Sequence, residues 1–228
     1  MPKTILILAF AAILGAAPIS DWFLGNTLAS GVWTSQASGG TITQSNGGVT
    51  LSAPAASTHD GYPSAVKISQ TIANSDLSVI TKISTIPPAQ TNGYYECSLG
   101  VYQDANNYVK IKYWSSSGSA YSISIQRDIA STVTALQTSA RSGDVFPIWF
   151  ELSRSTNAWD GKYSFNGTSW TDMGGGSATI TAATEQLWVD NWNSTGSSVI
   201  AYAPIFYFVC NSANDTCIPP VRPNRVSF

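Results

Sequence analysis

The expected fold of this chain rests on the stretch Tyr163-Ser164-Phe165-Asn166-Gly167-Thr168-Ser169-Trp170-Thr171-Asp172-Met173-Gly174. Alternating apolar and polar residues lie on both sides of Asn166-Gly167, and Asn-Gly is a strong signal for a tight turn between antiparallel strands. We therefore predict a hairpin here. From Asp76 to Met173 similar short alternating runs follow one another, which predicts a meander of β-strands.

The chain after residue 20 continues this β pattern and shows no convincing amphipathic helix. Short runs rich in Val, Ile, Thr, Tyr and Trp alternate with clusters of Gly, Ser and Asn, as in β-sandwiches and barrels. A length of 228 residues suits one such domain. The expected strands lie near 31–36, 40–44, 48–53, 64–70, 77–84, 93–102, 108–115, 120–127, 132–137, 145–154, 160–166, 178–182, 186–191, 198–203 and 205–210.

Alternation assigns faces to three of these strands, because successive side chains of a strand point to opposite sides. If the strands at 93–102, 108–115 and 145–154 are neighbours in one sheet, their less apolar sides form one outer face. Aromatic rings on such a face could pack against a sugar while polar groups orient its hydroxyls. The alternative is cross-strand pairing that only stabilises the sheet. The residues of this face are Tyr94, Glu96, Tyr102, Tyr108, Lys110, Lys112, Trp114, Trp149 and Glu151.

The composition favours an extracellular protein that does not bind nucleic acid. Charged residues make up only 11% of the chain, well below the usual quarter, and Ser, Thr, Asn and Gly carry the polar content. The net charge is −2 and the isoelectric point is about 5.2. The chain therefore has no electrostatic attraction for nucleic acid or an anionic membrane.

The N-terminus has the order of a secretory signal: Lys3, an apolar run from Ile5, then small residues up to Ala17. The run is shorter than the roughly 20 residues of a transmembrane helix, so we expect no stable membrane span. The alternative is a hydrophobic arm that the mature protein keeps. We divide the chain into this segment at 1–17, a β-sandwich at 20–210 and a C-terminal segment at 211–228.

The cysteines fit an oxidising compartment. Cys210 and Cys217 enclose a polar loop that a disulfide could close, whereas Cys97 lies in an apolar strand and is expected to be a free thiol. With only His59 beside three scattered cysteines, we predict no metal site of the zinc type. The glycosylation acceptor triplets begin at Asn166, Asn193 and Asn214.

Two segments resemble the concanavalin A-like lectin/glucanase superfamily, in particular its accessory, non-catalytic branch. The first runs from Asp21-Trp22-Phe23 through Trp33 to Gly47-Gly48-Val49-Thr50-Leu51. The second runs from Asp76 through Asn107-Tyr108-Val109-Lys110-Ile111 to the 163–170 hairpin, and Ile205–Val209 matches a closing strand. The resemblance covers roughly residues 20–210. It implies a two-sheet antiparallel jelly-roll sandwich with a concave face and loops at its rim.

Glycosidases of this superfamily carry a carboxylate cluster such as Glu-x-Asp-x-x-Glu on one strand, and this chain lacks it. Its glutamates are Glu96, Glu151 and Glu185 only, so we expect that the protein is not an enzyme. His59 lies in a turn-like segment and is a poor member of a catalytic triad. We predict no cofactor. A less favoured alternative is a Ca²⁺ site in a rim loop, with oxygen ligands from Asp104, Asn106 and Asn107 or from Asp190 and Asn191.

Three functions remain in view. The leading hypothesis is a secreted, non-catalytic carbohydrate-binding or adhesion domain for a polysaccharide or cell-surface glycan. Its rings would be those of Trp114 and Trp149, with Tyr102 or Tyr108, and its hydrogen-bonding groups would be Glu96, Lys110 and Asn107. The second is a structural subunit that self-assembles into a filament, surface layer or virion. The third is a glycoside hydrolase in which Glu96 and Glu151 meet across strands.

Overall fold

The computed structural model describes residues 23, 25–37, 39–45, 48–53, 66–84, 95–104, 106–117, 120–142, 147–180, 184–193 and 201–211. These residues form strands and turns and contain no helix, so none of them could span a membrane as a helix. The expected N-terminal signal lies outside the described residues. So does the C-terminal segment beyond Asn211.

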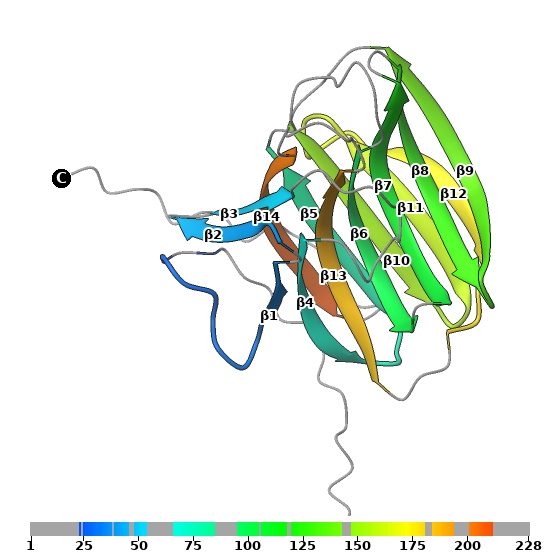
Figure 1. Ribbon diagram of the computed structural model, residues 1–228. Helices are drawn as coiled ribbons and strands as arrows, with labels where there is room; N and C mark the ends of the chain where they lie inside the picture. The colour runs from blue at the N-terminus through cyan, green and yellow to red at the C-terminus, as the bar shows by residue number, and fades with distance from the viewer. Residues whose placement is uncertain are drawn as a thin grey trace, which may run out of the picture.

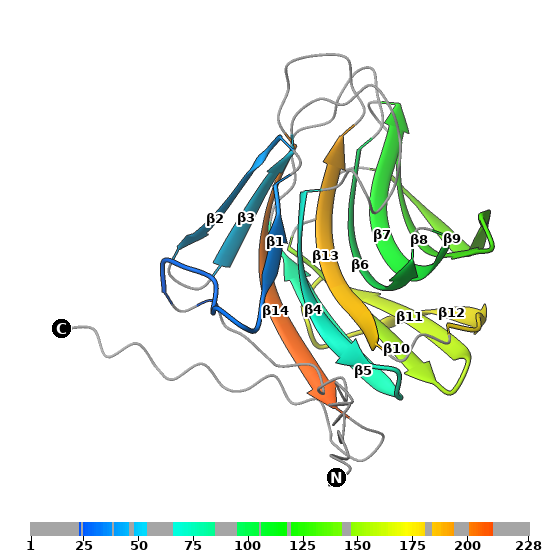
Figure 2. The same ribbon diagram turned by 60° about the horizontal axis from the view of Figure 1, so that its bottom comes forward.

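Fourteen described strands form two antiparallel sheets of seven, which confirms the predicted all-β jelly-roll sandwich. Figures 1 and 2 show the sheets as two layers. In spatial order, sheet A contains β1 (Thr34–Gln36), β4 (Val66–Ala73), β13 (Thr184–Asn193), β6 (Tyr95–Asp104), β7 (Asn107–Ser117), β8 (Ala120–Ile129) and β9 (Thr132–Ser142). Sheet B contains β12 (Thr171–Ser177), β11 (Ala158–Ser164), β10 (Ile148–Ser155), β5 (Leu77–Ile83), β14 (Ala201–Asn211), β3 (Gly48–Ala53) and β2 (Thr41–Ser45).

The hydrophobic core lies between the sheets, where alternate residues of facing strands meet. Ile111 of β7 and Ile125 of β8 are fully buried there. They contact Gly161 of β11: a Cβ at Gly161 would lie 3.1 Å from Cδ1 of Ile125 and 3.4 Å from Cδ1 of Ile111. The backbone of sheet B thus approaches the side chains of sheet A closely, and a glycine makes this approach possible.

The predicted Asn-Gly hairpin is confirmed and joins β11 to β12. Asn166 Oδ1 accepts hydrogen bonds from the backbone amides of Thr168 (2.9 Å) and Ser169 (2.7 Å). Gly167 has a φ of 73°, which is strained for residues with a Cβ. The side chain of Trp149 lies directly beneath this turn, 3.1 Å from where a Cβ of Gly167 would be.

Several strand predictions differ from the structure, and the expected strands also omit β12. Residues 201–203 and 205–210, which come from two separately expected runs, belong to the single strand β14, which pairs with β3 up to Ile205 and with β5 from Ile205 onward. Pro204, which lacks an amide donor, pairs with Thr50 of β3, and pairing with β5 begins only at Ile205, so the proline does not interrupt the β5 ladder. Residues 178–180 form no strand, although Ala178 and Ile180 are buried against the core.

Candidate functional site

The outer face of sheet A, the side turned away from sheet B, carries most of the predicted site residues. The register pairs Glu96 with Trp114 and Tyr102 with Tyr108, so β6 and β7 are neighbours as expected. Cys97, Leu99 and Val101 alternate with these residues and are buried in the core. Val109, Ile111 and Tyr113 of β7 are buried in the core as well, so the predicted inward and outward sets are confirmed for the described side chains of both strands.

A buried charged network occupies the middle of this face. Lys110 Nζ donates to Glu96 Oε1, and Lys112 Nζ donates to Glu96 Oε2 at 3.0 Å. Glu96 and Lys110 are each 1% exposed and Lys112 is 6% exposed. Removing charges from water is costly unless they are paired. The two lysines compensate Glu96 and fix its carboxylate between β6 and β7.

Aromatic rings flank this network, and two of them, Tyr102 and Trp114, are less buried than its charged groups. Trp114 is partly buried, its Nε1 donates to Ser124 Oγ at 2.8 Å, and Lys112 Nζ lies 5.2 Å from its ring centroid. Tyr102 is also partly buried and packs on Tyr108 in a small cluster separate from the main core. The face therefore combines held charges with partly accessible rings.

Asp128, at the end of β8, is a member of this face that the sequence did not indicate. It lies opposite Tyr108, is 7% exposed, and its Oδ1 is buried without a hydrogen-bond partner. Burial raises the pKa of its carboxyl, while a hydrogen bond from Tyr108 and the charge of Lys110 act to lower it. The strand predicted from the sequence ends at residue 127, so Asp128 falls just beyond it.

Trp149 and Glu151 do not share this face, so the predicted single binding face is wrong in that respect. Both lie on β10, which belongs to sheet B. Trp149 is packed beneath Gly167, with Lys82 Nζ 4.8 Å from its ring centroid. Glu151 Oε1 accepts a hydrogen bond from Ser78 Oγ at 3.1 Å. Alternation orders residues within a strand, but it cannot assign the strand to a sheet.

Asn107 closes the β6–β7 turn. Its Nδ2 donates to both oxygens of Asp104 (2.9 and 3.0 Å), and its Oδ1 accepts from the amide of Ala130 at 3.2 Å. The amide of Asn106 also donates to Asp104 at 2.9 Å and is the main cause of a lowered pKa of that carboxyl. Within the described part of the chain, no three His, Cys, Asp or Glu side chains form a group that could hold a metal.

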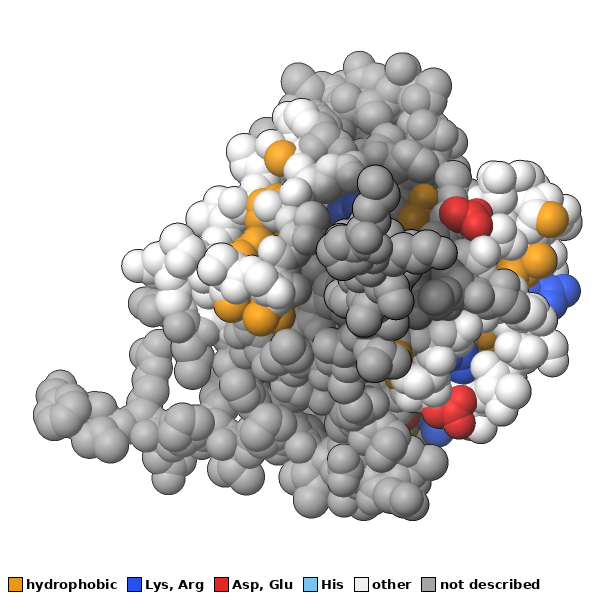
Figure 3. All heavy atoms as spheres, turned by 90° about the horizontal axis from the view of Figure 1, so that it is seen from below, with side chains coloured by type: hydrophobic (Ala, Val, Ile, Leu, Met, Phe, Trp, Pro, Cys, Tyr) orange, Lys and Arg blue, Asp and Glu red, His pale blue; other side chains and the backbone are white. Residues whose placement is uncertain are grey.

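The remaining predicted residues fall partly outside the described structure. Tyr94, Cys217 and Asn214 lie outside the described residues, as do the side chains of Cys210 and Asn193. Cys97 is a buried free thiol, and Asn166 is exposed at the tip of its hairpin. In Figure 3, acidic and basic side chains are interspersed with uncharged polar ones over the described surface of that view.

No family model matches the chain, and no curated protein matches it either. Solved structures do share the fold. The GH43 protein BlXynB of Bacillus licheniformis has a TM-score of 0.63 at 17% identity, with 82% of this chain and 38% of that chain covered. An endo-β-galactosidase of Clostridium perfringens that releases GlcNAcα1-4Gal has a TM-score of 0.57 at 12% identity. The match covers 91% of this chain and 64% of that chain. LamA of Z. galactanivorans, in complex with laminaritriose and laminaritetraose, has a TM-score of 0.55 at 10% identity. The match covers 85% of this chain and 98% of that chain.

These similar structures belong to carbohydrate-active enzymes, and they contradict the expectation that the protein is not an enzyme. The expectation rested on the absence of a Glu-x-Asp-x-x-Glu cluster within one strand. Such an absence does not exclude an enzyme, because carboxylates from separate strands of a sheet can also come together. The chain spans only 38% of BlXynB. At identities of 10–17% the likeness establishes a shared β-rich fold and no particular activity.

Proposed function

We propose that the protein is a concanavalin A-like domain that binds a polysaccharide across the outer face of sheet A. The observation that carries this proposal is the placement of aromatic rings at both ends of the β6–β7 pair, with Tyr102 and Tyr108 at one end, Trp114 at the other and the Lys110–Glu96–Lys112 network between them. Sugar rings expose both C–H groups and hydroxyls, and therefore suit a face that has both rings and polar groups.

The two parts of this face would have different tasks. Tyr102 and Trp114 are partly buried, so their rings would provide the contact area for the sugar. The charged network is almost fully buried and would hold the strands and ring orientations, rather than contact the ligand directly. Lys112 links the two parts, because it bonds to Glu96 and lies over the Trp114 ring. Preorganised rings lower the entropy cost of binding.

The test is titration of the full chain with laminarin and with a β-galactan, the sugar classes named for two of the similar proteins. Trp114→Ala and Tyr102→Ala should each weaken binding by about tenfold or more, as expected for central aromatic contacts. Trp149→Ala is the matched control on sheet B and should leave this affinity unchanged. Equal effects of all three substitutions would refute the assignment to sheet A.

A second candidate function is glycoside hydrolysis on the same face. It is favoured by Asp128, because burial raises the pKa of its carboxyl and its Oδ1 has no hydrogen-bond partner. A carboxyl of raised pKa suits a general acid. Asp128 would donate its proton to the glycosidic oxygen as the C–O bond breaks. Water would add to the anomeric carbon and lose a proton to solvent, and solvent would return a proton to Asp128.

Release of reducing ends from laminarin and β-galactan measures this activity. Asp128→Asn cannot donate the proton and should lower the rate by about 10²-fold or more while binding persists. Asp160→Asn removes another carboxyl of raised pKa, on sheet B, and should leave the rate unchanged. If wild-type protein releases no sugar from substrates that it binds, hydrolysis is excluded for them and the binding proposal stands.

A further inference from the structure

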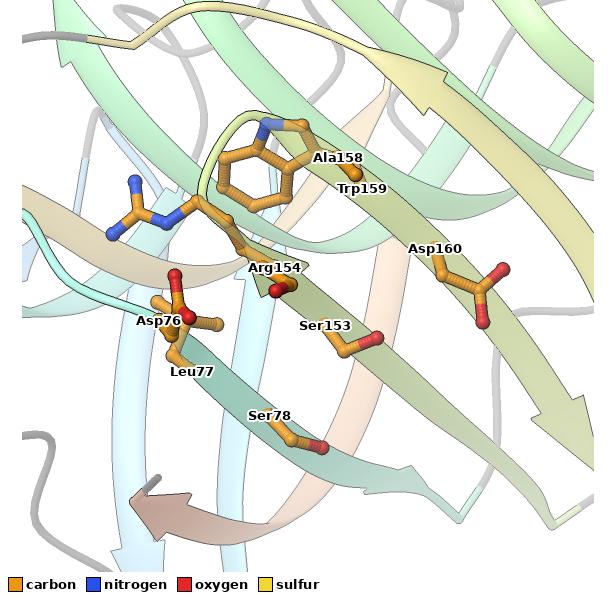
Figure 4. Close-up of a pocket in the computed structure, with 9 residues that line it drawn as sticks. Asp76, Leu77, Ser78, Ser153, Arg154, Ala158, Trp159 and Asp160 are labelled. Atoms are coloured by element: carbon orange, nitrogen blue, oxygen red, sulfur yellow. The ribbon is translucent and has the colours of Figure 1, made fainter. Parts of the chain in front are cut away.

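We propose that a cleft on sheet B, remote from the face described above, is a second saccharide-binding site. The cleft has a volume of about 320 Å³ and lies where β5, β10 and β11 meet the turns at one end of the sheet. It is open to solvent on one side. Figure 4 shows how its lining residues lie. Its lining residues are Asp76, Leu77, Ser78, Ser153, Arg154, Ser155, Ala158, Trp159 and Asp160.

Small side chains in one row create this space. Ser153 pairs with Ser78 on one side and with Asp160 on the other, so these three residues lie side by side across three strands. The next row contains the longer side chains of Glu151 and Lys162, which also pair with each other. Neighbouring strands are separated by roughly 4.8 Å, so the row of small residues extends about 10 Å across the sheet.

The polar groups of the cleft match hydroxyls better than ions. In Figure 4 the hydroxyls of Ser78 and Ser153 and the carboxyl of Asp160 point to the same side. Serine hydroxyls both donate and accept hydrogen bonds, as sugar hydroxyls do. The carboxyls of Asp76 and Asp160 would repel an anion. A cation is disfavoured by Lys162 Nζ, 3.6 Å from Asp160 Oδ2, and no group of three metal-ligating side chains occurs among the described residues.

Asp160 has the properties of a hydrogen-bonding group that can adapt to a neutral ligand. Burial raises the pKa of its carboxyl, and the nearby charge of Asp172 raises it further. Lys162 Nζ, at 3.6 Å from Asp160 Oδ2, acts in the opposite direction. A sugar hydroxyl could donate to the ionised carboxyl or accept from the protonated one.

The strands beneath the cleft are held in place from the core side of sheet B. Arg154 Nε donates to the carbonyl of Ser75 at 2.9 Å, and its guanidinium carbon lies 5.1 Å from the centroid of the Trp159 ring. Trp159 Nε1 in turn donates to the carbonyl of Ala178 at 2.9 Å. The amide of Thr156 donates to Asp76 Oδ1 at 2.6 Å. A site held in this way needs little rearrangement on binding.

The size of the cleft limits its ligand to a short saccharide. Small-molecule sites occupy roughly 300–1,000 Å³, and this cleft lies at the lower end of that range. We therefore assign it one or two sugar units at a chain end, whereas a long polysaccharide would cross sheet A. The presence of this second site does not depend on the function proposed for sheet A.

The experiment is a calorimetric and NMR titration of the full chain with laminaritetraose and with galactobiose. Ser153→Phe fills the cleft and should abolish cleft-localised shift changes. Asp160→Asn adds no bulk and should weaken cleft binding by about tenfold, because a hydrogen bond to a charged group is lost. Ser35→Phe on β1 is the matched control for an exposed aromatic substitution and should bind like the wild type.

Trp114→Ala separates this site from the first. If the inference is correct, that variant loses binding on sheet A and keeps the shifts around Ser78 and Asp160. Shift changes confined to sheet A, or unchanged binding in both Ser153→Phe and Asp160→Asn, would overturn the second site and leave the first intact. Ca²⁺ that shifts Asp76 and Asp160 when neither sugar does would also overturn it, because the cleft would then be a cation site.

Discussion

The outer faces of sheets A and B use charge in opposite ways. On sheet A, Glu96 and its two lysines are almost fully buried and satisfy one another. On sheet B, Asp160 and Lys162 are partly exposed and 3.6 Å apart. Buried pairs depend strongly on both partners, whereas exposed pairs contribute little. The charges on sheet A are therefore fixed by one another, whereas those on sheet B stay accessible to solvent.

The sharpest test of this comparison is removal of one carboxylate from each face. Glu96→Gln would leave Lys110 and Lys112 buried without their counter-charge and should lower the free energy of unfolding by about 3–5 kcal/mol. Glu151→Gln on sheet B should change it by less than about 0.5 kcal/mol, because this side chain is partly exposed. Urea unfolding measures both. Similar losses in the two variants would contradict the proposed difference between the faces.

The contact between the sheets offers the next test. Gly161→Ala places a methyl group 3.1 Å from Ile125 Cδ1 and should destabilise the fold by about 1–3 kcal/mol through overpacking. Adding Ile125→Val removes Cδ1 of Ile125, the atom nearest to the new methyl group, and should recover part of the lost free energy of unfolding. A double variant no better than the sum of the two single substitutions would show that the sheets are not packed at this point as described.

The pH dependence of stability tests Asp128 on sheet A. Its pKa is raised in the folded state, so folding favours the protonated form. This contribution is fully present below the unfolded pKa and is lost as the pH rises through the folded pKa. Melting temperatures should therefore fall more steeply with rising pH in the wild type than in Asp128→Asn over that range. Parallel curves would indicate that Asp128 has no raised pKa.

The smallest expected effects concern signal cleavage, disulfide formation and glycosylation, which would occur outside the two faces. Expression in a glycosylating host should give a product that lacks roughly the first 17 residues. It should carry the Cys210–Cys217 disulfide and a glycan on exposed Asn166. Intact mass before and after reduction and glycosidase treatment checks all three. Asn166→Gln should lose one glycan, whereas Asn157→Gln, outside any acceptor triplet, should lose none.

Much of the fold could be predicted because its determinants are local. The Asn166-Gly167 turn and the two sides of β6 and β7 follow from neighbouring residues, since turn chemistry and strand alternation act over a few positions. Asp128 could not be recognised in the same way. Its importance comes from Tyr108 and Lys110 on the adjacent strand, and from burial that no local pattern reports.

The sequence by itself determined that the chain forms short two-sided strands, where its best hairpin turns, and which residues of β6 and β7 point away from the core. Only the tertiary structure decided that β10 lies in the other sheet, which separates Trp149 and Glu151 from Glu96 and Trp114. The physical reason is that strand pairing joins segments far apart in the chain. β10 pairs with β5, more than 60 residues earlier, through backbone hydrogen bonds that carry no residue-specific pattern.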